Sequence, residues 1–222
     1  MNTQVSKNIE AVAESIQWFG QAAVKIMNCG KVIYIDPYQI KGNDKADLIL
    51  ITHSHFDHFS PDDIKKILAP HTWILCPPDV TDEAQKFGAA KVIAVQPGFN
   101  DEWHGIEIKT VPMYNVAKSD KHPKSKNWVG YLLNLCHVWL YHTGDTERIP
   151  EMKSIKTDII MLPLGQTYTM NSVDDAAAAV LDTGASVAIP IHYGMYEGTT
   201  ADVDRFKELL KDKVEVIVLP KS

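Results

Sequence analysis

Four possible metal ligands lie within six residues of the sequence, as His53, His55, Asp57 and His58. Alternate residues of an extended segment point the same way, so the first three side chains can converge, and a turn at Asp57 can bring His58 beside them. Imidazole nitrogens and carboxylate oxygens are preferred ligands of Zn²⁺ and similar ions. A histidine-rich surface loop is the alternative, but such a loop would not usually follow a buried strand and precede a well-capped helix. The segment therefore predicts a metal site.

A carboxylate and a histidine later in the chain could complete this site, because each directly follows an expected strand. The run 138–142 leads through Gly144, which permits a tight turn, to Asp145. The run 186–191 leads to His192. Taken alone, Asp145 would more often cap a helix, and His192 would as often be a packed core histidine. A ligand residue at three strand ends favours metal binding for both.

These ligands require strands that deliver them and helices that cover the sheets. The run 47–52 is apolar, as expected for a strand buried on both faces, and it ends at His53. A helix should follow Ser60, which supplies an N-cap before Pro61 and two aspartates. Further strands are expected at 15–19, 22–27, 32–36, 73–76, 91–95, 106–112, 129–135, 138–142, 158–164, 186–191 and 214–219, and further helices at 79–87, 172–181 and 200–210.

The order of these elements fits two mixed sheets packed face to face with helices outside, although composition alone would not distinguish this from a doubly wound sheet. A length of 222 residues suits one domain, and the sequence has no repeat or obvious linker. We therefore expect a single domain over residues 1–222.

Charge and composition limit the partners. The net charge is -6 and the charges of both signs are mixed, so the chain has neither a basic footprint for nucleic acid nor a polybasic membrane patch. The lysine-rich stretch 118–126 is interrupted by Asp120 and turn formers, as in a solvated loop. We expect a small-molecule substrate, no nucleic acid and no membrane contact. The oligomeric state is not specified by the sequence.

The cysteines bear on the compartment. Cys29, Cys76 and Cys136 are scattered and odd in number, without a Cys-x-x-Cys pair. This pattern argues against a disulfide scaffold or a zinc ribbon and favours reduced, buried thiols. Residues 1–13 lack the apolar segment of a secretory signal. No apolar run approaches the roughly 20 residues that span a bilayer. We expect a cytoplasmic protein.

Three motifs together resemble the metallo-β-lactamase superfamily: Thr-His-x-His-x-Asp-His at 52–58, Gly-Asp-Thr at 144–146, and the strand-end residue His192. The resemblance covers nearly the whole chain. It implies an α+β fold, a four-layer αββα sandwich, with a two-metal site in the cleft between the sheets. Shorter stretches resemble the small branch that includes the L-ascorbate-6-phosphate lactonase-like proteins, namely 18–21, 35–37, 142–146, 162–165, 168–170 and 190–194.

The resemblance also implies which side chains hold each metal. The first metal would be held by His53 and His55, the second by Asp57, His58 and His192, and Asp145 would bridge them. The superfamily usually supplies a further histidine to the first metal just after the strand at 106–112, where this chain reads Met-Tyr-Asn-Val. Asn115 could offer a weak oxygen ligand, but we expect His122 from the following loop to take this place. Gln21 stands where the family usually has another histidine and is expected to form hydrogen bonds at the site.

We therefore expect a metal-dependent hydrolase with one or two Zn²⁺ ions, although Mn²⁺ or Fe²⁺ would also suit these ligands. Two cations would lower the pKa of a shared water, and the hydroxide would attack an ester, lactone or phosphodiester. Asp57 would orient this nucleophile and take its proton, and Tyr168, Tyr193 and Asn115 are candidate substrate contacts. The absent family histidine leaves a second class open, a non-catalytic metal-binding or ligand-sensing protein with a degraded first site. An iron redox enzyme on the same scaffold is a third alternative.

Overall fold

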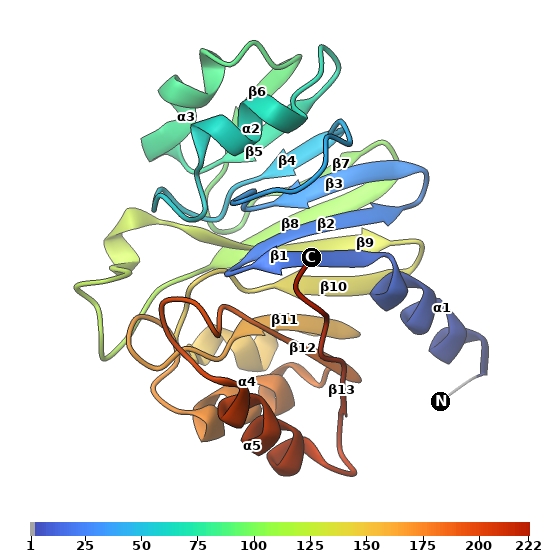
Figure 1. The fold of residues 1–222 in the computed structure, drawn as a ribbon, viewed down its shortest axis with the longest axis vertical. Helices are drawn as coiled ribbons and strands as arrows, with labels where there is room; N and C mark the ends of the chain where they lie inside the picture. Colours follow the sequence, from blue (N-terminus) through green and yellow to red (C-terminus); the bar gives the residue numbers. More distant parts are fainter. Residues whose placement is uncertain (1–2) are drawn as a thin grey trace.

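Two β-sheets packed face to face form the centre of the protein, whose computed structural model describes residues 3–222 (Figure 1). One sheet has the order β1 (Ile16–Gly20), β2 (Ala23–Asn28), β3 (Lys31–Ile35), β4 (Leu48–Leu50), β5 (Trp73–Cys76) and β6 (Lys91–Ala94). The other has the order β13 (Glu215–Val216), β12 (Val187–Ile191), β11 (Ile159–Pro163), β10 (Val138–His142), β9 (Val129–Leu135), β8 (Ile106–Pro112) and β7 (Asn100–Trp103).

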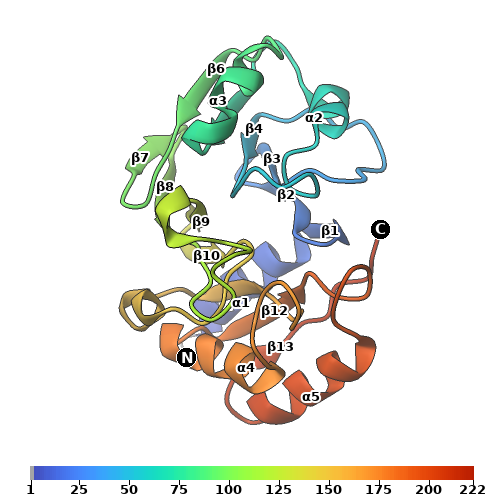
Figure 2. The same ribbon diagram turned by 90° about the vertical axis from the view of Figure 1, so that its left-hand side faces the viewer.

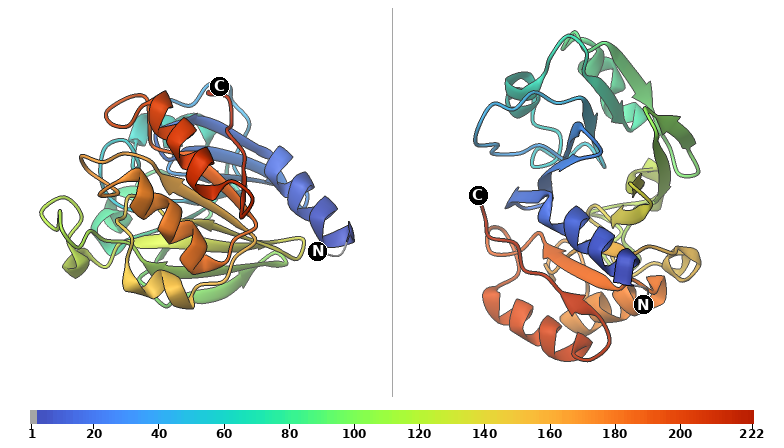
Figure 3. Two further views of the ribbon diagram at one scale, coloured as in Figure 1. Left: turned by 90° about the horizontal axis from the view of Figure 1, so that it is seen from below. Right: turned by 90° about the vertical axis from the view of Figure 1, so that its right-hand side faces the viewer.

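Helices cover the outer faces of both sheets. Figure 2 shows α2 (Pro61–Ile67) and α3 (Pro78–Gln85) over the first sheet, and α4 (Val173–Thr183) and α5 (Thr200–Leu210) over the second. Helix α1 (Thr3–Glu14) packs at one end of the molecule against β1 and β10 (Figure 3). Two short 3₁₀ helices, η1 (Lys124–Lys126) and η2 (Pro150–Ser154), lie in connecting segments. The predicted αββα sandwich is confirmed, and the doubly wound sheet is excluded because the strands form two sheets.

The direction of the strands explains where functional side chains gather. In each sheet one half is antiparallel and the other parallel: β3 to β6 run in one direction, and so do β10 to β13. Parallel strands end at the same edge, so the segments after β3, β4, β10 and β12 meet at one end of the sandwich. Three of these four segments carry the ligand residues that the sequence indicated.

Strand β4 is buried on both faces, as its apolar run predicts. Leu48 and Leu50 pack into the core between the two sheets, whereas Ile49 and Ile51 pack under α2 and α3. The helix after it starts as predicted, because the Ser60 side chain accepts a hydrogen bond from an amide in the first turn. The metal-binding segment is thus held between two well-anchored elements.

Two elements are absent from the sequence-based predictions. Strand β7 is a polar edge strand with one inward side chain, Trp103, so it has no apolar alternation to detect. Helix α1 is mostly polar, and its short buried stripe of Ile9, Val12 and Ala13 becomes evident only where it packs. The strand expected at 214–219 is shorter than predicted, since only the two residues of β13 join the sheet.

The prediction of three reduced, buried thiols is wrong for two of them. Cys29 and Cys136 are exposed at the tips of the β2–β3 and β9–β10 hairpins and form a disulfide, with Cα atoms 6.2 Å apart. The two hairpins belong to different sheets and are 107 residues apart in the sequence, so their proximity is a tertiary feature. Cys76 is free and buried, as predicted. The cytoplasmic location, which rested partly on reduced thiols, stays a prediction. Each helix within residues 3–222 is too short or too polar to cross a bilayer.

Candidate metal centre

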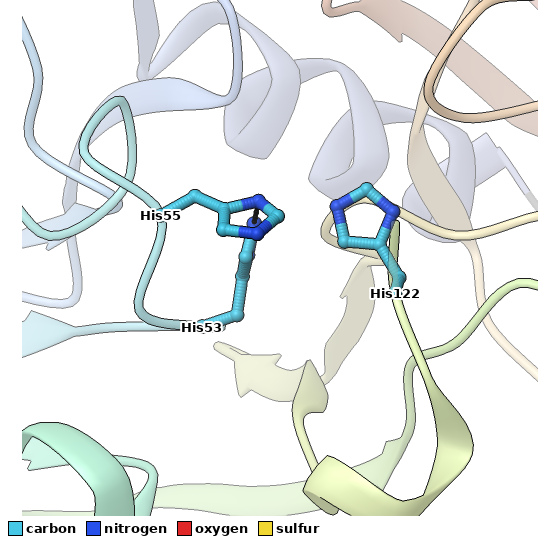
Figure 4. Close-up of side chains that lie close together, drawn as sticks. All are labelled: His53, His55 and His122. Atoms are coloured by element: carbon cyan, nitrogen blue, oxygen red, sulfur yellow. Dashed lines mark hydrogen bonds between the residues drawn. The ribbon is translucent and has the colours of Figure 1, made fainter. Parts of the chain in front are cut away.

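Three histidines form the first ligand group at the end of the sandwich. His53 and His55 follow β4, and His122 comes from the loop between β8 and β9 on the opposite side (Figure 4). One nitrogen from each ring lies within 4.8 Å of those of the other two. His53 Nε2 is 3.0 Å from His55 Nδ1, and the His122 side chain is 1% exposed. The structure thus brings the histidine expected from the distant loop to the first group.

The second ligand group contains Asp57, His58 and His192, whose ligand atoms also lie within 4.8 Å of one another. The backbone turns after His55, whose carbonyl accepts hydrogen bonds from the amides of His58 and Phe59 at 3.0 and 2.8 Å. This turn brings His58 round beside Asp57, as the sequence indicated.

Asp145 lies between the two groups. Its Oδ2 atom is 3.0 Å from His192 Nε2, 3.2 Å from His58 Nε2 and 3.7 Å from His122 Nε2. Gly144 permits this position, because its φ is +65° and a Cβ atom there would lie 2.6 Å from the Met113 sulfur. Only glycine fits the turn that presents Asp145.

Asp36 orients His58 from behind. This fully buried carboxylate accepts hydrogen bonds from the amide and hydroxyl of Thr52, at 2.7 and 2.6 Å, and lies 2.7 Å from His58 Nδ1. His58 Nε2 consequently faces Asp145. A carboxylate behind a ligand histidine fixes its ring and tautomer, which is typical of metal centres.

Glu197 has the same relation to His192. Its Oε1 atom is 2.9 Å from His192 Nδ1 and accepts a hydrogen bond from the Thr169 hydroxyl. Its Oε2 atom accepts hydrogen bonds from the backbone amides of Thr167 and Tyr168. Gly165 leaves the space for it, because a Cβ at that position would overlap the Glu197 carboxyl carbon. Glu197 therefore joins a candidate ligand to the loop after β11.

Three residues at the centre have a left-handed backbone that non-glycine residues rarely adopt. The φ angles are +46° at Gln21, +49° at Asp36 and +53° at His192. The amide of His192 donates to the Gln21 carbonyl at 2.8 Å, which ties two of these residues together. Such conformations cost on the order of 1–3 kcal/mol each and are concentrated at functional sites.

The electrostatics differ between the two histidine groups. Burial lowers the pKa of His53 well below its usual value and that of His122 to about 4, so these rings are neutral near pH 7. Burial also lowers the pKa of His58, but the charges of Asp145 and Asp36 outweigh it and raise that pKa to about 10. Burial raises the pKa of Asp57, but the hydrogen bond with His192 and the charge of His58 prevail and lower it to about 2. Burial likewise lowers the pKa of His192, but the charge of Asp145 outweighs it and raises that pKa well above its usual value. The first group therefore holds the neutral imidazoles that bind metal ions, whereas an ion in the second group would displace the protons of His58 and His192.

Several buried polar atoms at the centre make no hydrogen bond within the described chain. They are His58 Nε2, both ring nitrogens of His122, Asp145 Oδ1, His192 Nδ1 and Gln21 Oε1. A buried polar atom without a partner costs about 1–3 kcal/mol, and natural proteins seldom leave several together. Five of these six atoms belong to the two groups or to the carboxylate between them, and the sixth belongs to Gln21, which donates a hydrogen bond to Asp57. The donor set, three imidazoles on one side and two imidazoles with a carboxylate on the other, fits two transition-metal ions.

The pocket above this centre has a volume of about 430 Å³. Its walls include candidate ligands together with side chains from three loops: His55, Phe56, Asp57, Lys121, His122, Asp145, Tyr168, His192 and Tyr196. Tyr168 is therefore placed where the sequence expected a substrate contact. Phe56, Lys121 and Tyr196 were not singled out from the sequence, although an aromatic residue inside the His53–His58 segment is a signal that could have been used.

The other proposed substrate contacts lie outside the pocket. The Tyr193 ring stacks on Trp18, with centroids 5.1 Å apart, the residue is only 9% exposed, and it is not among the described lining residues of the pocket, so its contact with substrate stays a prediction. Asn115 is 2% exposed and donates its amide to the Tyr168 carbonyl at 2.6 Å. It supports the loop that carries Tyr168, instead of reaching substrate or the first ligand group.

Gln21 forms the hydrogen bonds that were expected of it from the sequence. Gln21 Nε2 donates to Asp57 Oδ2 at 3.2 Å and lies 3.0 Å from His192 Nε2, so it forms hydrogen bonds at the centre. His142 is fully buried, and its Nε2 lies 2.9 Å from the carbonyl oxygen of Ala22. The other three histidines, His71, His104 and His137, are exposed.

Comparison with known proteins places this geometry in context. The family model described as a beta-lactamase superfamily domain matches residues 15–192. A relative from Thermoplasma acidophilum, named a UPF0173 metal-dependent hydrolase, is 30% identical over 92% of this chain and 94% of its own. The crystal structure of a putative metal-dependent hydrolase from Parabacteroides distasonis has a TM-score of 0.81 and 30% identity, covering 92% of this chain and 91% of that one. A putative Zn-dependent hydrolase of the metallo-beta-lactamase superfamily from Thermotoga maritima has a TM-score of 0.64 at 20% identity, covering 92% and 97%, and shares the fold.

Proposed function

The chain belongs to the β-lactamase superfamily, and we propose that it is a metal-dependent hydrolase that uses two Zn²⁺ ions to cleave an ester, lactone or phosphodiester bond in a small molecule. The observation that carries the proposal is the position of Asp145, whose Oδ2 lies within 3.7 Å of histidines from both ligand groups. One carboxylate oxygen between two sets of imidazoles is the arrangement that two neighbouring cations require.

Each group has a role in this proposal. His53, His55 and His122 would hold the first ion, Asp57, His58 and His192 the second, and Asp145 would contact both. Two such ions, when bound, lower the pKa of a water shared between them and neutralise charge that develops on the substrate oxygen. Mn²⁺ and Fe²⁺ also suit nitrogen and carboxylate ligands, so elemental analysis of the purified protein must establish the native metal.

Asp57 would accept the proton of the attacking water. It lines the pocket, is ionised, and is held by the hydrogen bond from Gln21 Nε2. That bond fixes one carboxylate oxygen of Asp57 beside the second ligand group, where the attacking water would lie. Tyr168, on another wall of the pocket, would contact the substrate.

The test compares metal content and hydrolysis in the same preparations. His55→Ala and Asp145→Ala should lose bound metal and turnover on ester, lactone and phosphodiester substrates while retaining the fold by circular dichroism. His71→Ala, an exposed histidine outside the centre, is the control and should match the wild type. Full activity in the metal-stripped protein would refute the proposal.

The alternative is a non-catalytic metal-binding or ligand-sensing protein, and it rests on the absence of the superfamily's usual histidine after β8. The nearness of His122 to His53 and His55 weakens that motive, because a third imidazole is available to the first ion. One tightly bound ion per chain, together with no hydrolysis across the three substrate classes, would favour the alternative.

A further inference from the structure

Three aromatic side chains from distant parts of the sequence meet at the mouth of the pocket. Tyr38 follows β3, Phe56 lies inside the metal-binding segment, and Tyr196 lies between β12 and α5. The Phe56 ring makes edge contacts with both others, each with centroids 5.9 Å apart. The hydroxyls of Tyr38 and Tyr196 are 2.8 Å apart. We call Tyr38, Phe56 and Tyr196 the aromatic wall.

The aromatic wall exposes apolar surface toward the pocket. Phe56 is 65% exposed and Tyr196 is 46% exposed, and both line the pocket beside the candidate ligands. The ring of Phe56 cannot withdraw into the core, because its neighbours His55 and Asp57 are held at the centre. Large apolar side chains that remain exposed together mark a binding surface more often than scattered ones do.

The pocket also has little positive charge of its own. Lys121 is the single lysine or arginine among the described lining residues, and it forms an ion pair with Asp120 at 2.9 Å. The nearby Lys118 ammonium is engaged by the Met170 carbonyl and the Asn171 side chain. Both arginines of the chain are paired elsewhere, Arg148 with Asp182 and Arg205 with Asp174. Recognition of a phosphate or carboxylate away from the metal ions would need such groups.

From these observations we propose that the aromatic wall is a specificity subsite, which binds an uncharged alkyl or aromatic group that the substrate carries next to the bond that is cleaved. This inference rests on the proposed function and narrows its substrate class. The scissile group would lie at the metal centre, and the apolar group would cover Phe56 and Tyr196 at the mouth. A substrate whose remaining part is strongly anionic, such as a sugar phosphate, would meet only one lysine and no arginine among the described lining residues.

The hydroxyl pair keeps the wall uncharged. The hydrogen bond with Tyr38 raises the pKa of Tyr196 to about 12, so its phenol remains neutral at physiological pH. The wall therefore offers ring faces and edges, which favour apolar groups through burial of their surface.

The test uses methyl acetate, methyl butyrate and methyl hexanoate with the metal-loaded protein, so that the acyl chain is the only large apolar group of each substrate. In the wild type, kcat/KM should increase by about fourfold for each methylene group that becomes buried. Phe56→Ala should reduce kcat/KM for the hexanoate by about tenfold, mainly through KM, and should leave that for the acetate almost unchanged. The control is Met27→Ala, which removes a side chain that is 54% exposed but lies outside the pocket. The half-ester of adipate has the same chain with a terminal carboxylate, and it should be a poorer substrate than the hexanoate.

Equal effects of Phe56→Ala on acetate and hexanoate, or preference for the adipate half-ester, would overturn the inference. Calorimetric measurement of how acetate and hexanoate anions bind to the metal-loaded protein tests the apolar subsite independently of whether the protein is a hydrolase. Both anions have the same carboxylate, so tighter binding of hexanoate, lost in Phe56→Ala, supports the subsite even if no ester is hydrolysed. Equal binding of the two anions refutes it.

Discussion

The role of Glu197 behind His192 leads to a prediction that can be worked out atom by atom. In Glu197→Gln the side-chain oxygen of the new glutamine can still accept the two hydrogen bonds that Oε2 accepts now, from the backbone amides of Thr167 and Tyr168. The NH₂ group must then replace Oε1, where it meets the Thr169 hydroxyl and His192 Nδ1. The hydroxyl can rotate to accept, but an imidazole that binds metal through Nε2 carries its proton on Nδ1. Two donors would therefore face each other.

The expected magnitude follows from this single lost interaction. Loss of a partner behind a ligand histidine reduces metal affinity by about 10–100-fold, which corresponds to roughly 1.4–2.8 kcal/mol. The metal-free protein should lose about 1.5–3 kcal/mol of unfolding free energy, because the buried ion pair between His192 Nδ1 and the Glu197 carboxylate is removed. Competition with a chromogenic zinc chelator measures the affinity, and urea unfolding of the metal-free protein measures the stability.

A matched control distinguishes positioning of His192 from general destabilisation. Asp63 is another buried carboxylate, and it accepts two backbone amides, the Ser60 hydroxyl and the Lys66 ammonium, but it contacts neither ligand group. Asp63→Asn should lower stability by a similar amount and leave metal affinity unchanged. Unchanged affinity in Glu197→Gln, or an equal loss in Asp63→Asn, would show that the reasoning is wrong.

Three further outcomes follow from the structure. His122→Ala should release the ion of the first ligand group and leave one ion per chain by elemental analysis, whereas retention of two would exclude His122 as a ligand. Burial raises the pKa of Asp63, but hydrogen bonds with Ser60, Lys66 and two backbone amides outweigh it, so the pKa in the folded protein is lowered. The contribution of Asp63 to stability is therefore complete above the pKa of the unfolded chain, near 4, and is lost as the pH falls through the lower pKa of the folded protein. The stability difference between wild type and Asp63→Asn should therefore shrink in acid, as measured by urea unfolding, and a difference that grows instead would contradict this. Because Cys29 and Cys136 form a disulfide and Cys76 is buried, a chromogenic thiol reagent should find no rapidly reacting thiol in the native protein and two after mild reduction. Two reactive thiols before reduction would contradict the pairing.

The elements and most of the candidate site could be predicted from the sequence because the signals are local. The apolar run before His53 marks a strand buried on both faces, and the Ser60 cap marks the helix after it. The metal-binding segment between them is specified by residue type and spacing alone. Strand-end positions also indicated Asp145 and His192, since parallel strands deliver their following residues to one edge.

Interactions between distant segments could not be predicted in the same way. Tyr193 is a candidate substrate contact by sequence, and only the fold shows that it packs on Trp18 from β1. The sequence around Glu197 has no motif, and its role depends on the loop after β11 that surrounds it. The hairpin tips that pair Cys29 with Cys136 likewise meet only in the folded sandwich.

The sequence by itself determined which side chains could bind metal and on which strand ends they stand, because ligand chemistry and strand periodicity are properties of neighbouring residues. Only the tertiary structure decided that His122 joins the first ligand group and that the Phe56 ring meets two tyrosines at the pocket mouth. These choices depend on how loops from the two sheets approach one another. The packing of the sheets fixes that approach, and no local pattern of residues records it.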